Sequence, residues 1–264
     1  MTRNRQQPGT VLITGATGAI GGALARHYAA SGATLYLQGR NEAVLQSISR
    51  ECQQLGARVE VFVLDLSDQL QLFDWLETLK QMALPDLVFA NAGMNINTGP
   101  DNQGESWQAM DKLLDLNVKS TMALIHHMAL LMRQRGSGQL VLISSLAAWF
   151  GLPVTPSYSA SKAAVKAYGE GLRGWLAGSG VGVSVVMPGY IQSDMCEAMP
   201  GPKPFMLTPA QAVQRISKGV ARNRPRIVFP WLLGYGCWWL TVLPPGLSQW
   251  ILQKLDYTPH KPGV

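Results

Sequence analysis

Cysteine is scarce in this sequence, and its three cysteines lie far apart. Cys52, Cys196 and Cys237 show none of the paired spacings that disulfide-rich domains and zinc sites require. A reducing compartment is the simpler interpretation, so we expect a cytoplasmic protein. The adjacent pair His126 and His127 would diverge by ~100° on a helix and could not easily share an ion. We therefore expect no metal site.

Long hydrophobic runs are also missing. The most apolar stretch of the chain, FPWLLGYGCWWLTVLPP at residues 229–245, has thirteen mostly apolar residues before a Pro-Pro pair interrupts it. A helix needs ~20 residues to cross the hydrocarbon core of a membrane. We therefore do not expect this stretch to span a membrane, and we expect residues 230–264 to form a hydrophobic C-terminal extension.

Acidic residues are absent from residues 198–255, which contain seven basic ones, so the net charge of +6 belongs to this region. Four tryptophans lie within it, at positions 231, 238, 239 and 250. Tryptophan at headgroup depth and basic side chains facing anionic lipid are typical of a segment that lies on a membrane surface. The region contains no recognised nucleic-acid-binding module, so we expect no nucleic-acid partner.

Three interpretations of this C-terminal region are open at this point. Residues 203–254 could contact an anionic membrane surface, which would place the protein peripherally on the inner membrane face. They could form the seam of a homodimer or homotetramer. They could also line a pocket for a hydrophobic small-molecule substrate. Membrane contact and a pocket wall would both give the protein access to a hydrophobic molecule.

Short apolar runs alternate with stretches of helical length along the chain. Runs such as LVLIS and VSVVM are apolar almost throughout, as strands buried on both faces must be. The alternation predicts an α/β fold, with a parallel sheet covered by helices on both faces. A length of 264 residues fits one domain with a small appendage. The predicted strands are 11–14, 34–38, 59–64, 87–90, 140–144, 181–187 and 226–229, and the clearest predicted helices are 22–31, 42–55, 68–82 and 158–177.

The first predicted strand runs into a glycine-rich turn, in the stretch VLITGATGAIGG. Its glycines permit a tight turn in which backbone N–H groups approach a pyrophosphate at the start of a helix. Such a turn can also occur without a ligand, but its place at the start of a long β–α series favours dinucleotide binding. The predicted cofactor-binding residues here are Gly15, Thr17, Gly18, Ala19, Ile20 and Gly21.

The ends of the next three strands supply further candidates. The second strand is followed by Gly39 and Arg40, where an acidic residue would bond the ribose hydroxyls of NAD and a guanidinium suits the 2′-phosphate of NADP. The sequence therefore favours NADP(H) over NAD(H), although Arg40 would also fit an exposed position beside a helix cap at Asn41. The other cofactor candidates at this edge are Asp65, Leu66, Asn91, Ala92 and Gly93.

The stretch ISSLAAWFGLPVTPSYSASKAAVKAY carries the candidate chemistry. Tyr158 and Lys162 are four residues apart on a predicted helix and so share one face. A phenol is a poor acid at neutral pH because its unperturbed pKa is about 10. A nearby ammonium, together with the positive charge of an oxidised nicotinamide, stabilises the phenolate and brings that pKa toward working pH. Ser145, at the end of the fifth predicted strand, could donate a hydrogen bond to the same substrate oxygen.

The ordered motifs between Thr10 and Met195 resemble the short-chain dehydrogenase/reductase superfamily, in its short single-domain branch. The resemblance implies a doubly wound Rossmann-type fold, a nicotinamide cofactor, and Tyr158 as proton donor or acceptor with Lys162 and Ser145 assisting. It also implies that Asn117, in DLNVKS, holds a water that relays protons through the lysine. Beside the nicotinamide it places Pro188, Gly189, Ile191 and Ser193, at the start of a substrate loop of about 188–209.

The glycine turn departs from the usual pattern of this branch. Ala19 stands where the branch usually has glycine, and the spacing Gly15-x-x-Gly18-x-x-Gly21 resembles the longer, epimerase-type branch. That branch carries a larger C-terminal substrate domain, for which too little chain would remain here. The shorter branch therefore fits better, with a slightly altered pyrophosphate turn.

Together these features predict an NADP(H)-dependent oxidoreductase that interconverts a ketone and a secondary alcohol in a single domain at residues 1–229. The substrate is expected to be hydrophobic and of 3-oxoacyl, steroid-like or lipid-linked type, because a fold shared by many activities names no substrate. The alternative is an NAD(P)-binding scaffold or sensor recruited to the membrane within a biosynthetic complex. The complete set of Ser145, Tyr158 and Lys162 argues against that alternative.

Overall fold

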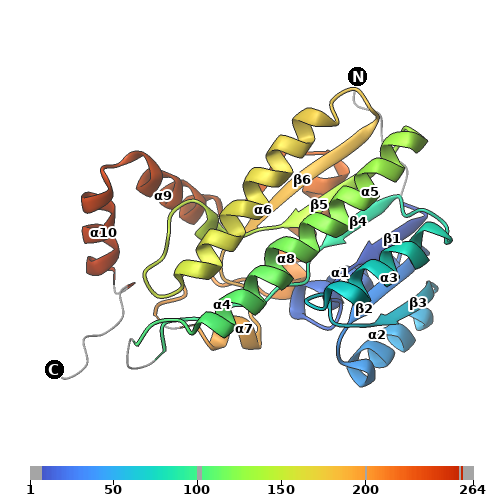
Figure 1. Ribbon diagram of the computed structural model, residues 1–264, viewed down its shortest axis with the longest axis horizontal. Helices are drawn as coiled ribbons and strands as arrows, with labels where there is room; N and C mark the ends of the chain where they lie inside the picture. Colours follow the sequence, from blue (N-terminus) through green and yellow to red (C-terminus); the bar gives the residue numbers. More distant parts are fainter. Residues whose placement is uncertain (1–7, 100–102, 200, 256, 258–264) are drawn as a thin grey trace.

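A parallel sheet of seven strands forms the centre of the molecule (Figure 1). The computed structural model describes residues 8–99, 103–199, 201–255 and 257. The strand order is β3-β2-β1-β4-β5-β6-β7, so the chain winds outward from β1 in one direction and then in the other. The α/β, doubly wound fold predicted from the sequence is thus confirmed. The strands are β1 (Thr10–Ile13), β2 (Thr34–Gly39), β3 (Arg58–Val63), β4 (Leu87–Ala90), β5 (Gly138–Ile143), β6 (Val181–Pro188) and β7 (Arg226–Phe229).

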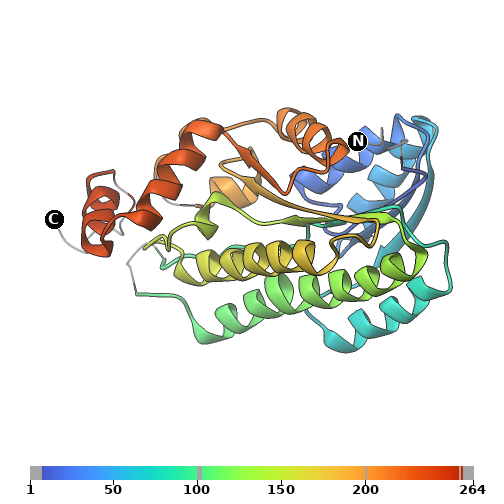
Figure 2. The same ribbon diagram turned by 90° about the horizontal axis from the view of Figure 1, so that it is seen from above.

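Helices cover both faces of the sheet (Figure 2). The side chains of β1 alternate between two cores, with Val11 and Ile13 packed toward one layer of helices and Leu12 toward the other. This burial on both faces explains why the inner strands are apolar almost throughout. The first layer contains α1 (Ala19–Ala29), α2 (Glu42–Gln54) and α8 (Pro209–Ala221), the second contains α3 (Gln69–Lys80), α5 (Thr121–Arg135) and α6 (Pro156–Trp175), and the shorter helices are α4 (Trp107–Leu114) and α7 (Asp194–Glu197).

The first helix begins earlier than the sequence predicts. Its expected start is Gly22, but the helix begins at Ala19 and runs through Gly21. A Cβ at position 21 would lie 2.2 Å from the carbonyl oxygen of Gly15, so the helix can start this close to the turn only with glycine there. Glycine has a low intrinsic helix propensity. Here the close packing of the turn overrides that propensity.

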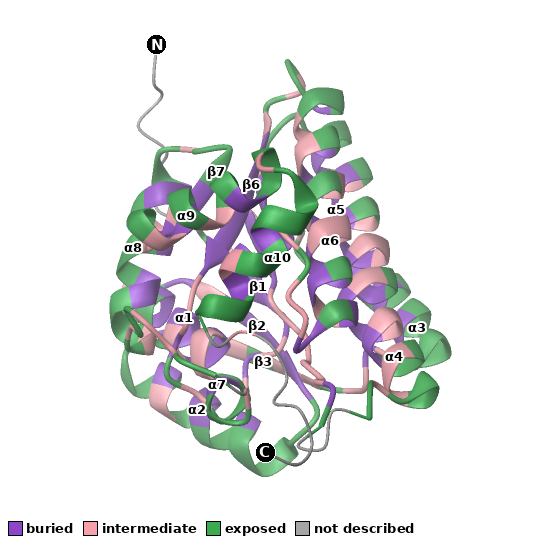
Figure 3. Cartoon of the chain, turned by 90° about the vertical axis from the view of Figure 1, so that its left-hand side faces the viewer, coloured by how far each residue is buried: buried purple, intermediate pink, exposed green. Residues whose placement is uncertain are grey.

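The C-terminal extension forms two helices, α9 (Trp231–Val242) and α10 (Pro245–Lys254), beyond the carboxyl edge of the sheet. Figure 3 views the molecule from this side and shows mostly exposed residues on both helices. Every helix in the described ranges is too short or too polar to span a membrane. Residue 200 of the expected substrate loop and residues 256 and 258–264 of the expected extension lie outside the described residues.

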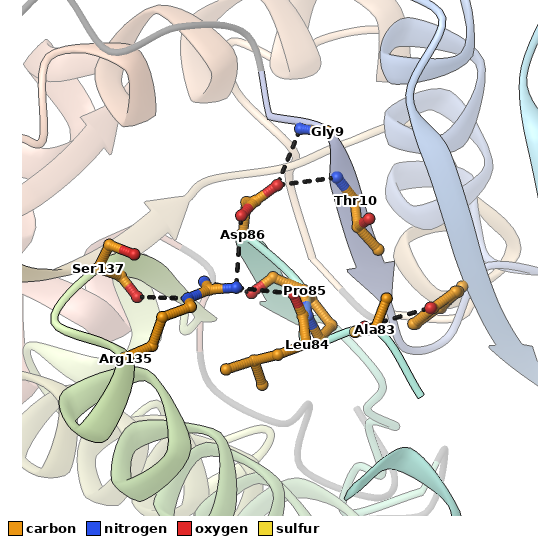
Figure 4. Close-up of polar contacts among 9 residues, drawn as sticks. Gly9, Thr10, Ala83, Leu84, Pro85, Asp86, Arg135 and Ser137 are labelled. Carbon is orange, nitrogen blue, oxygen red and sulfur yellow. Dashed lines mark hydrogen bonds and ion pairs between the residues drawn. The ribbon is translucent and has the colours of Figure 1, made fainter. Parts of the chain in front are cut away.

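At the opposite edge of the sheet, Asp86 joins three segments (Figure 4). Its Oδ2 accepts hydrogen bonds from the backbone N–H groups of Gly9 and Thr10, at 2.9 and 3.0 Å. The guanidinium of Arg135, at the end of α5, lies 3.5 Å from Oδ1 of Asp86 and donates to three backbone carbonyls nearby. These polar contacts brace the start of β1, the approach to β4 and the end of α5 against one another.

Candidate active site

The glycine turn lies between β1 and α1, at the carboxyl edge of the sheet. Gly15 has a φ of +62°, which glycine adopts readily, and a Cβ there would lie 2.8 Å from Cα of Ala92. The helix begins after Gly18 without a side-chain cap, so no side chain occupies its first N–H groups. Free N–H groups at the positive end of a helix bind phosphate. The turn therefore fits the pyrophosphate of a dinucleotide.

Two buried polar side chains that the sequence analysis did not single out hold this turn in place. The hydroxyl of Thr14 accepts hydrogen bonds from the N–H groups of Asn91 and its neighbour, at 3.0 and 3.1 Å. Oε1 of Gln38 accepts from the N–H of Gly15 at 3.1 Å, and Nε2 donates to a carbonyl after β3. Asn91 in turn donates to the carbonyls of Thr14 and Gly15. A glutamine inside the apolar run LYLQG is the signal that could have indicated this role.

The end of β2 carries no acidic side chain, because position 39 is glycine. A Cβ at Gly39 would lie 2.7 Å from Cγ2 of Thr17. The next residue, Arg40, is exposed, and its guanidinium lies 3.8 Å from Oδ2 of Asp65. Partial burial opposes ionisation of Asp65, but hydrogen bonds from Ser67 and the charge of Arg40 together hold its pKa below the usual value. The edge of the site thus presents a guanidinium in place of a carboxylate at the end of β2.

Tyr158 and Ser145 come together from two different elements. Tyr158 lies in the first turn of α6, and Ser145 caps the short 3₁₀ turn Leu146–Ala148 that follows β5. A hydrogen bond joins the Tyr158 hydroxyl to the Ser145 side chain. Burial raises the pKa of Tyr158 above its ordinary value, and the hydrogen bond offsets this effect only in part. The phenol is therefore held in its protonated form at neutral pH.

Lys162 lies one turn further along α6 and is only 6% exposed. Its Nζ donates to the carbonyl of Ile143 at 3.0 Å and lies 5.6 Å from the centre of the Tyr158 ring. Burial lowers the pKa of Lys162 from 10.5 to about 8. An ammonium has three hydrogens, so donors remain for a ligand in addition to the bond to Ile143.

Asn117 lies behind this group, in a π-helical segment, Asp115–Ser120, that joins α4 to α5. Its Oδ1 accepts from the N–H of Met94 at 2.8 Å, while Nδ2 donates to the carbonyl of Met94 at 2.9 Å and to the hydroxyl of Ser161 at 3.0 Å. The amide therefore holds the loop after β4 against α6. The proton relay that the resemblance implies for Asn117 stays a prediction.

The segment that follows β6 closes the site. The N–H of Gly189 donates to a carbonyl of β7 at 2.8 Å, and a Cβ at Gly189 would lie 3.1 Å from Cδ of Pro230. Ile191 forms a β-bridge with Leu207, and the hydroxyl of Ser193 caps α7. The segment is thereby fixed between the end of β7 and the start of α8, next to the catalytic candidates.

A cavity of about 660 Å³ connects these residues. Every predicted site residue lines it except Gly21, Asp65 and Asn117, which lie behind the residues that do. The C-terminal helices also line this cavity, which is the arrangement that the pocket-wall interpretation predicts. The lining residues from α9, α10 and their flanks are Leu233, Gly236, Cys237, Trp239, Leu240, Leu243, Ile251, Leu252, Leu255 and Tyr257.

Comparison with known proteins identifies the family. The family model for short chain dehydrogenases matches residues 9–202, more than half of the chain. This chain belongs to the short-chain dehydrogenase family. As a member of it, the protein is an oxidoreductase that acts on CH–OH groups and binds NAD(P), and the resemblance seen in the sequence is confirmed.

Three relatives illustrate the range of similarity. An uncharacterized oxidoreductase of Myxococcus xanthus is 34% identical over 93% of this dehydrogenase and 97% of its own length. A 3-oxoacyl-acyl-carrier-protein reductase of Rickettsia conorii is 30% identical over 72% of this chain and 76% of its own. The structure of a short-chain dehydrogenase from Sphingobium yanoikuyae in complex with NADPH superposes with a TM-score of 0.79, at 25% identity, over 94% of this chain and 96% of that one.

Two tyrosines of the dehydrogenase line the cavity without having been predicted to do so. The hydroxyl of Tyr190 donates to that of Tyr257 at 3.1 Å, and Tyr257 donates to the carbonyl of Pro202 at 2.8 Å. These bonds join the substrate loop to the residue that ends the described chain. The position of Tyr190 directly after the Pro-Gly motif is the only feature of the sequence that could have placed it at the site. Nothing in the sequence relates Tyr257 to a partner 67 positions away.

Proposed function

We propose that this dehydrogenase uses NADP(H) to interconvert a ketone and a secondary alcohol on a hydrophobic substrate. The observation that carries the proposal is that Tyr158 lines one cavity together with the glycine turn and with apolar side chains of α9 and α10. Ser145 and Lys162 lie beside it in the same cavity. A carbonyl placed at Tyr158 would have a proton donor on one side and room for a nicotinamide on the other.

Each of the three side chains has a distinct task in this proposal. A bound reduced nicotinamide supplies the hydride that the carbonyl carbon gains. The hydroxyl of Tyr158 gives its proton to the carbonyl oxygen, and Ser145 donates a hydrogen bond to that oxygen as negative charge develops. The ammonium of Lys162 stabilises the tyrosinate that remains. Alcohol oxidation runs through the same groups in reverse.

The preference for NADP(H) over NAD(H) rests on the end of β2. Position 39 is glycine, next to the methyl of Thr17, so no carboxylate there bonds the ribose hydroxyls. The guanidinium of Arg40 lines the same cavity and suits a 2′-phosphate, which it can bind with two parallel hydrogen bonds. The Sphingobium yanoikuyae relative in complex with NADPH is consistent with this preference.

The walls of the cavity support a hydrophobic substrate. The side chains of Leu233, Leu240 and Leu252 offer no hydrogen bonds, so they suit a substrate that is apolar beyond its carbonyl group. A 3-oxoacyl group meets this requirement, as the name of the Rickettsia conorii relative suggests. Steroid-like and lipid-linked ketones meet it equally.

The first test is the substitution Tyr158→Phe, assayed by NADPH oxidation over lipophilic ketones and 3-oxoacyl thioesters. Removing the proton donor should lower kcat by about 10²–10⁴-fold and leave NADPH binding, measured by fluorescence titration, largely intact. Tyr168→Phe, on the same helix but outside the cavity, is the matched control and should retain activity. Full turnover by Tyr158→Phe would remove the tyrosine from the mechanism. A wild-type protein that binds NADPH tightly but reduces no ketone would favour the scaffold or sensor alternative.

A further inference from the structure

Helices α9 and α10 carry an unusually apolar exposed surface. Within α9 only Gly234 and Leu240 are buried, although the helix is apolar on every side. Tyr235, Trp238 and Trp239 pack on one another with ring centres 5.3 to 6.0 Å apart. Monomeric soluble proteins rarely expose large contiguous apolar patches unless these bind something. The exposed members of this α9–α10 surface are Trp231, Leu232, Tyr235, Trp238, Trp239, Val242, Leu247, Trp250 and Leu255.

The α9–α10 surface is continuous with the active-site cavity. Trp239 is 43% exposed and Leu255 is 55% exposed, yet both line the cavity. The rim of the cavity is therefore made of residues that belong to the apolar surface. Leu233 and Cys237, which are partly buried, line the same cavity as Tyr158. An apolar molecule could move from this surface to the catalytic tyrosine without crossing a polar barrier formed by these two helices.

We propose that the α9–α10 surface binds the headgroup region of a lipid leaflet, and that hydrophobic substrate enters the cavity directly from the lipid. The second part rests on the function proposed above, whereas the first part stands on the surface alone. Short helices rich in tryptophan and leucine lie in the plane of the membrane interface and do not cross the bilayer. Exposed indoles such as those of Trp231 and Trp250 are typical of side chains at headgroup depth.

The position of the cavity rim favours lipid over a second copy of the chain. A partner subunit seated on the α9–α10 surface would cover Trp239 and Leu255 and so would close this side of the cavity. A lipid leaflet on the same surface would leave the cavity accessible and would hold the proposed substrates at high local concentration.

The charge around this surface favours an anionic leaflet. Neither helix contains an acidic residue, and the ammonium of Lys254 lies 6.0 Å from the centre of the Trp250 ring. Of the seven basic residues in the region, Lys254 is the one within the two helices, while Arg215 and Lys218 lie on α8. Aromatic contact must therefore provide most of the attraction, with the net charge of +6 adding to it.

Vesicle flotation of the full-length protein tests the proposal. Wild type should float with vesicles of phosphatidylcholine and phosphatidylglycerol, and less well with phosphatidylcholine alone. The double variant Trp231→Ser/Trp250→Ser removes two exposed indoles that do not line the cavity, and its partitioning should fall ~10-fold or more. The matched control is Trp107→Ser/Trp175→Ser, which removes two exposed indoles from α4 and α6 and should float like wild type.

Two results would overturn the proposal: a wild type that floats with neither kind of vesicle, and a Trp231/Trp250 double variant that floats as well as wild type. In the first case, a molar mass in light scattering that drops on the Trp231/Trp250 substitution would identify a second copy as the occupant. Flotation needs no turnover, and reduction of a water-soluble ketone should be unchanged in both double variants. A failure of lipid binding is thus distinguishable from a failure of the proposed chemistry.

Discussion

At the scale of single residues, the proposed preference for NADP(H) rests on Gly39 and Arg40. Position 39 is glycine and so offers no carboxylate, and a Cβ there would crowd Cγ2 of Thr17 at 2.7 Å. Arg40 is therefore the side chain proposed to bind the 2′-phosphate of NADP(H). Its neighbour Asp65 is ionised, and a carboxylate cannot bind a phosphate. The proposed preference for NADP(H) thus depends on one guanidinium.

The substitution Arg40→Gln tests that dependence. It should weaken NADPH binding about 10- to 100-fold, because a charge-assisted hydrogen bond contributes about 1.5–3 kcal/mol, and it should leave NADH binding nearly unchanged. Isothermal titration with both cofactors measures this, with Arg50→Gln on the exposed side of α2 as control. An equal loss for both cofactors would mean that Arg40 supports the fold and does not bind the phosphate.

Lys162 is a second residue whose environment makes a measurable prediction, through the pH dependence of stability. Burial lowers the pKa of Lys162 to about 8 in the folded protein, whereas the unfolded chain keeps the ordinary value of 10.5. Between these two pH values the unfolded chain therefore binds more protons than the folded one. The free energy of unfolding attributable to Lys162 therefore rises with pH in this window. Below pH 8 the lysine is charged in both states and its burial is fully unfavourable.

Urea unfolding of Lys162→Met against wild type, without cofactor, checks this. The variant should be the more stable protein at pH 7.5, and its advantage should shrink by about 2 kcal/mol by pH 9.5. The exposed Lys218→Met should show a difference from wild type that does not change with pH. An advantage of Lys162→Met that grew with pH would contradict the proposed effect of burial.

Some of the residues that the sequence predicted are marked by local spacing, and others by a place at a strand end or by the family resemblance. Tyr158 and Lys162 are one helical turn apart, and the glycines of the turn lie within a few positions of one another. Thr14 escaped prediction because its partner, Asn91, is 77 positions away, and a single threonine at a strand end has many ordinary uses. Pairings of this kind arise only when the sheet brings strand ends together.

At the scale of elements, the strands were predictable and the last two helices were not. The strand predicted at 226–229 coincides with β7, and the others agree within two residues. The inner strands are marked by nearly continuous apolar runs because both of their faces are buried, whereas the edge strand β3 is only partly buried. Helix α9 is apolar on every side, so no periodicity in its sequence marks the face that packs against the cavity. Only the structure separates its pocket-lining residues from its exposed ones.

Gly236 marks the place where α9 sets the size of the substrate. It lines the cavity, and a Cβ there would meet no atom within 4 Å. Gly236→Leu should therefore fill part of the cavity, lowering kcat/KM for a bulky ketone ~10-fold or more while changing that for a short methyl ketone little. The helix itself should tolerate the change, since leucine is favoured over glycine in helices by somewhat under ~1 kcal/mol.

Gly246→Leu provides the control for this experiment. Gly246 also lies in a C-terminal helix with open space around its Cβ position, but it does not line the cavity. Its substitution should leave both ketones unaffected. If Gly236→Leu slowed the two ketones to the same extent, α9 would not form the substrate wall.

At the scale of the whole molecule, chemistry and bracing are placed at opposite edges of the sheet. The cavity lies at the carboxyl edge, where the glycine turn, Ser145 and the segment after β6 meet. The ion pair of Asp86 and Arg135 lies at the amino-terminal edge (Figure 4). The homodimer or homotetramer expected from the sequence stays a prediction, and light scattering of the wild type in the flotation experiment will report on it.

This separation predicts that Arg135 can be changed without harm to catalysis. Arg135→Ala removes an ion pair with Asp86 and three hydrogen bonds to backbone carbonyls, so the free energy of unfolding should fall by about 1–3 kcal/mol. Arg133→Ala, two residues earlier on α5, removes a guanidinium stacked 4.9 Å from the centre of the Trp175 ring and should cost only about 0.5–1 kcal/mol.

Urea unfolding and steady-state kinetics on the same preparations compare the two variants. Both should retain the kcat/KM of wild type below their unfolding transitions, because neither arginine lines the cavity. A variant Arg135→Ala with normal stability but slowed turnover would show that the amino-terminal edge communicates with Tyr158 through the sheet. Loss of stability alone, with unchanged kcat/KM, would establish that the bracing contacts serve the fold and leave the carboxyl edge free to determine cofactor and substrate.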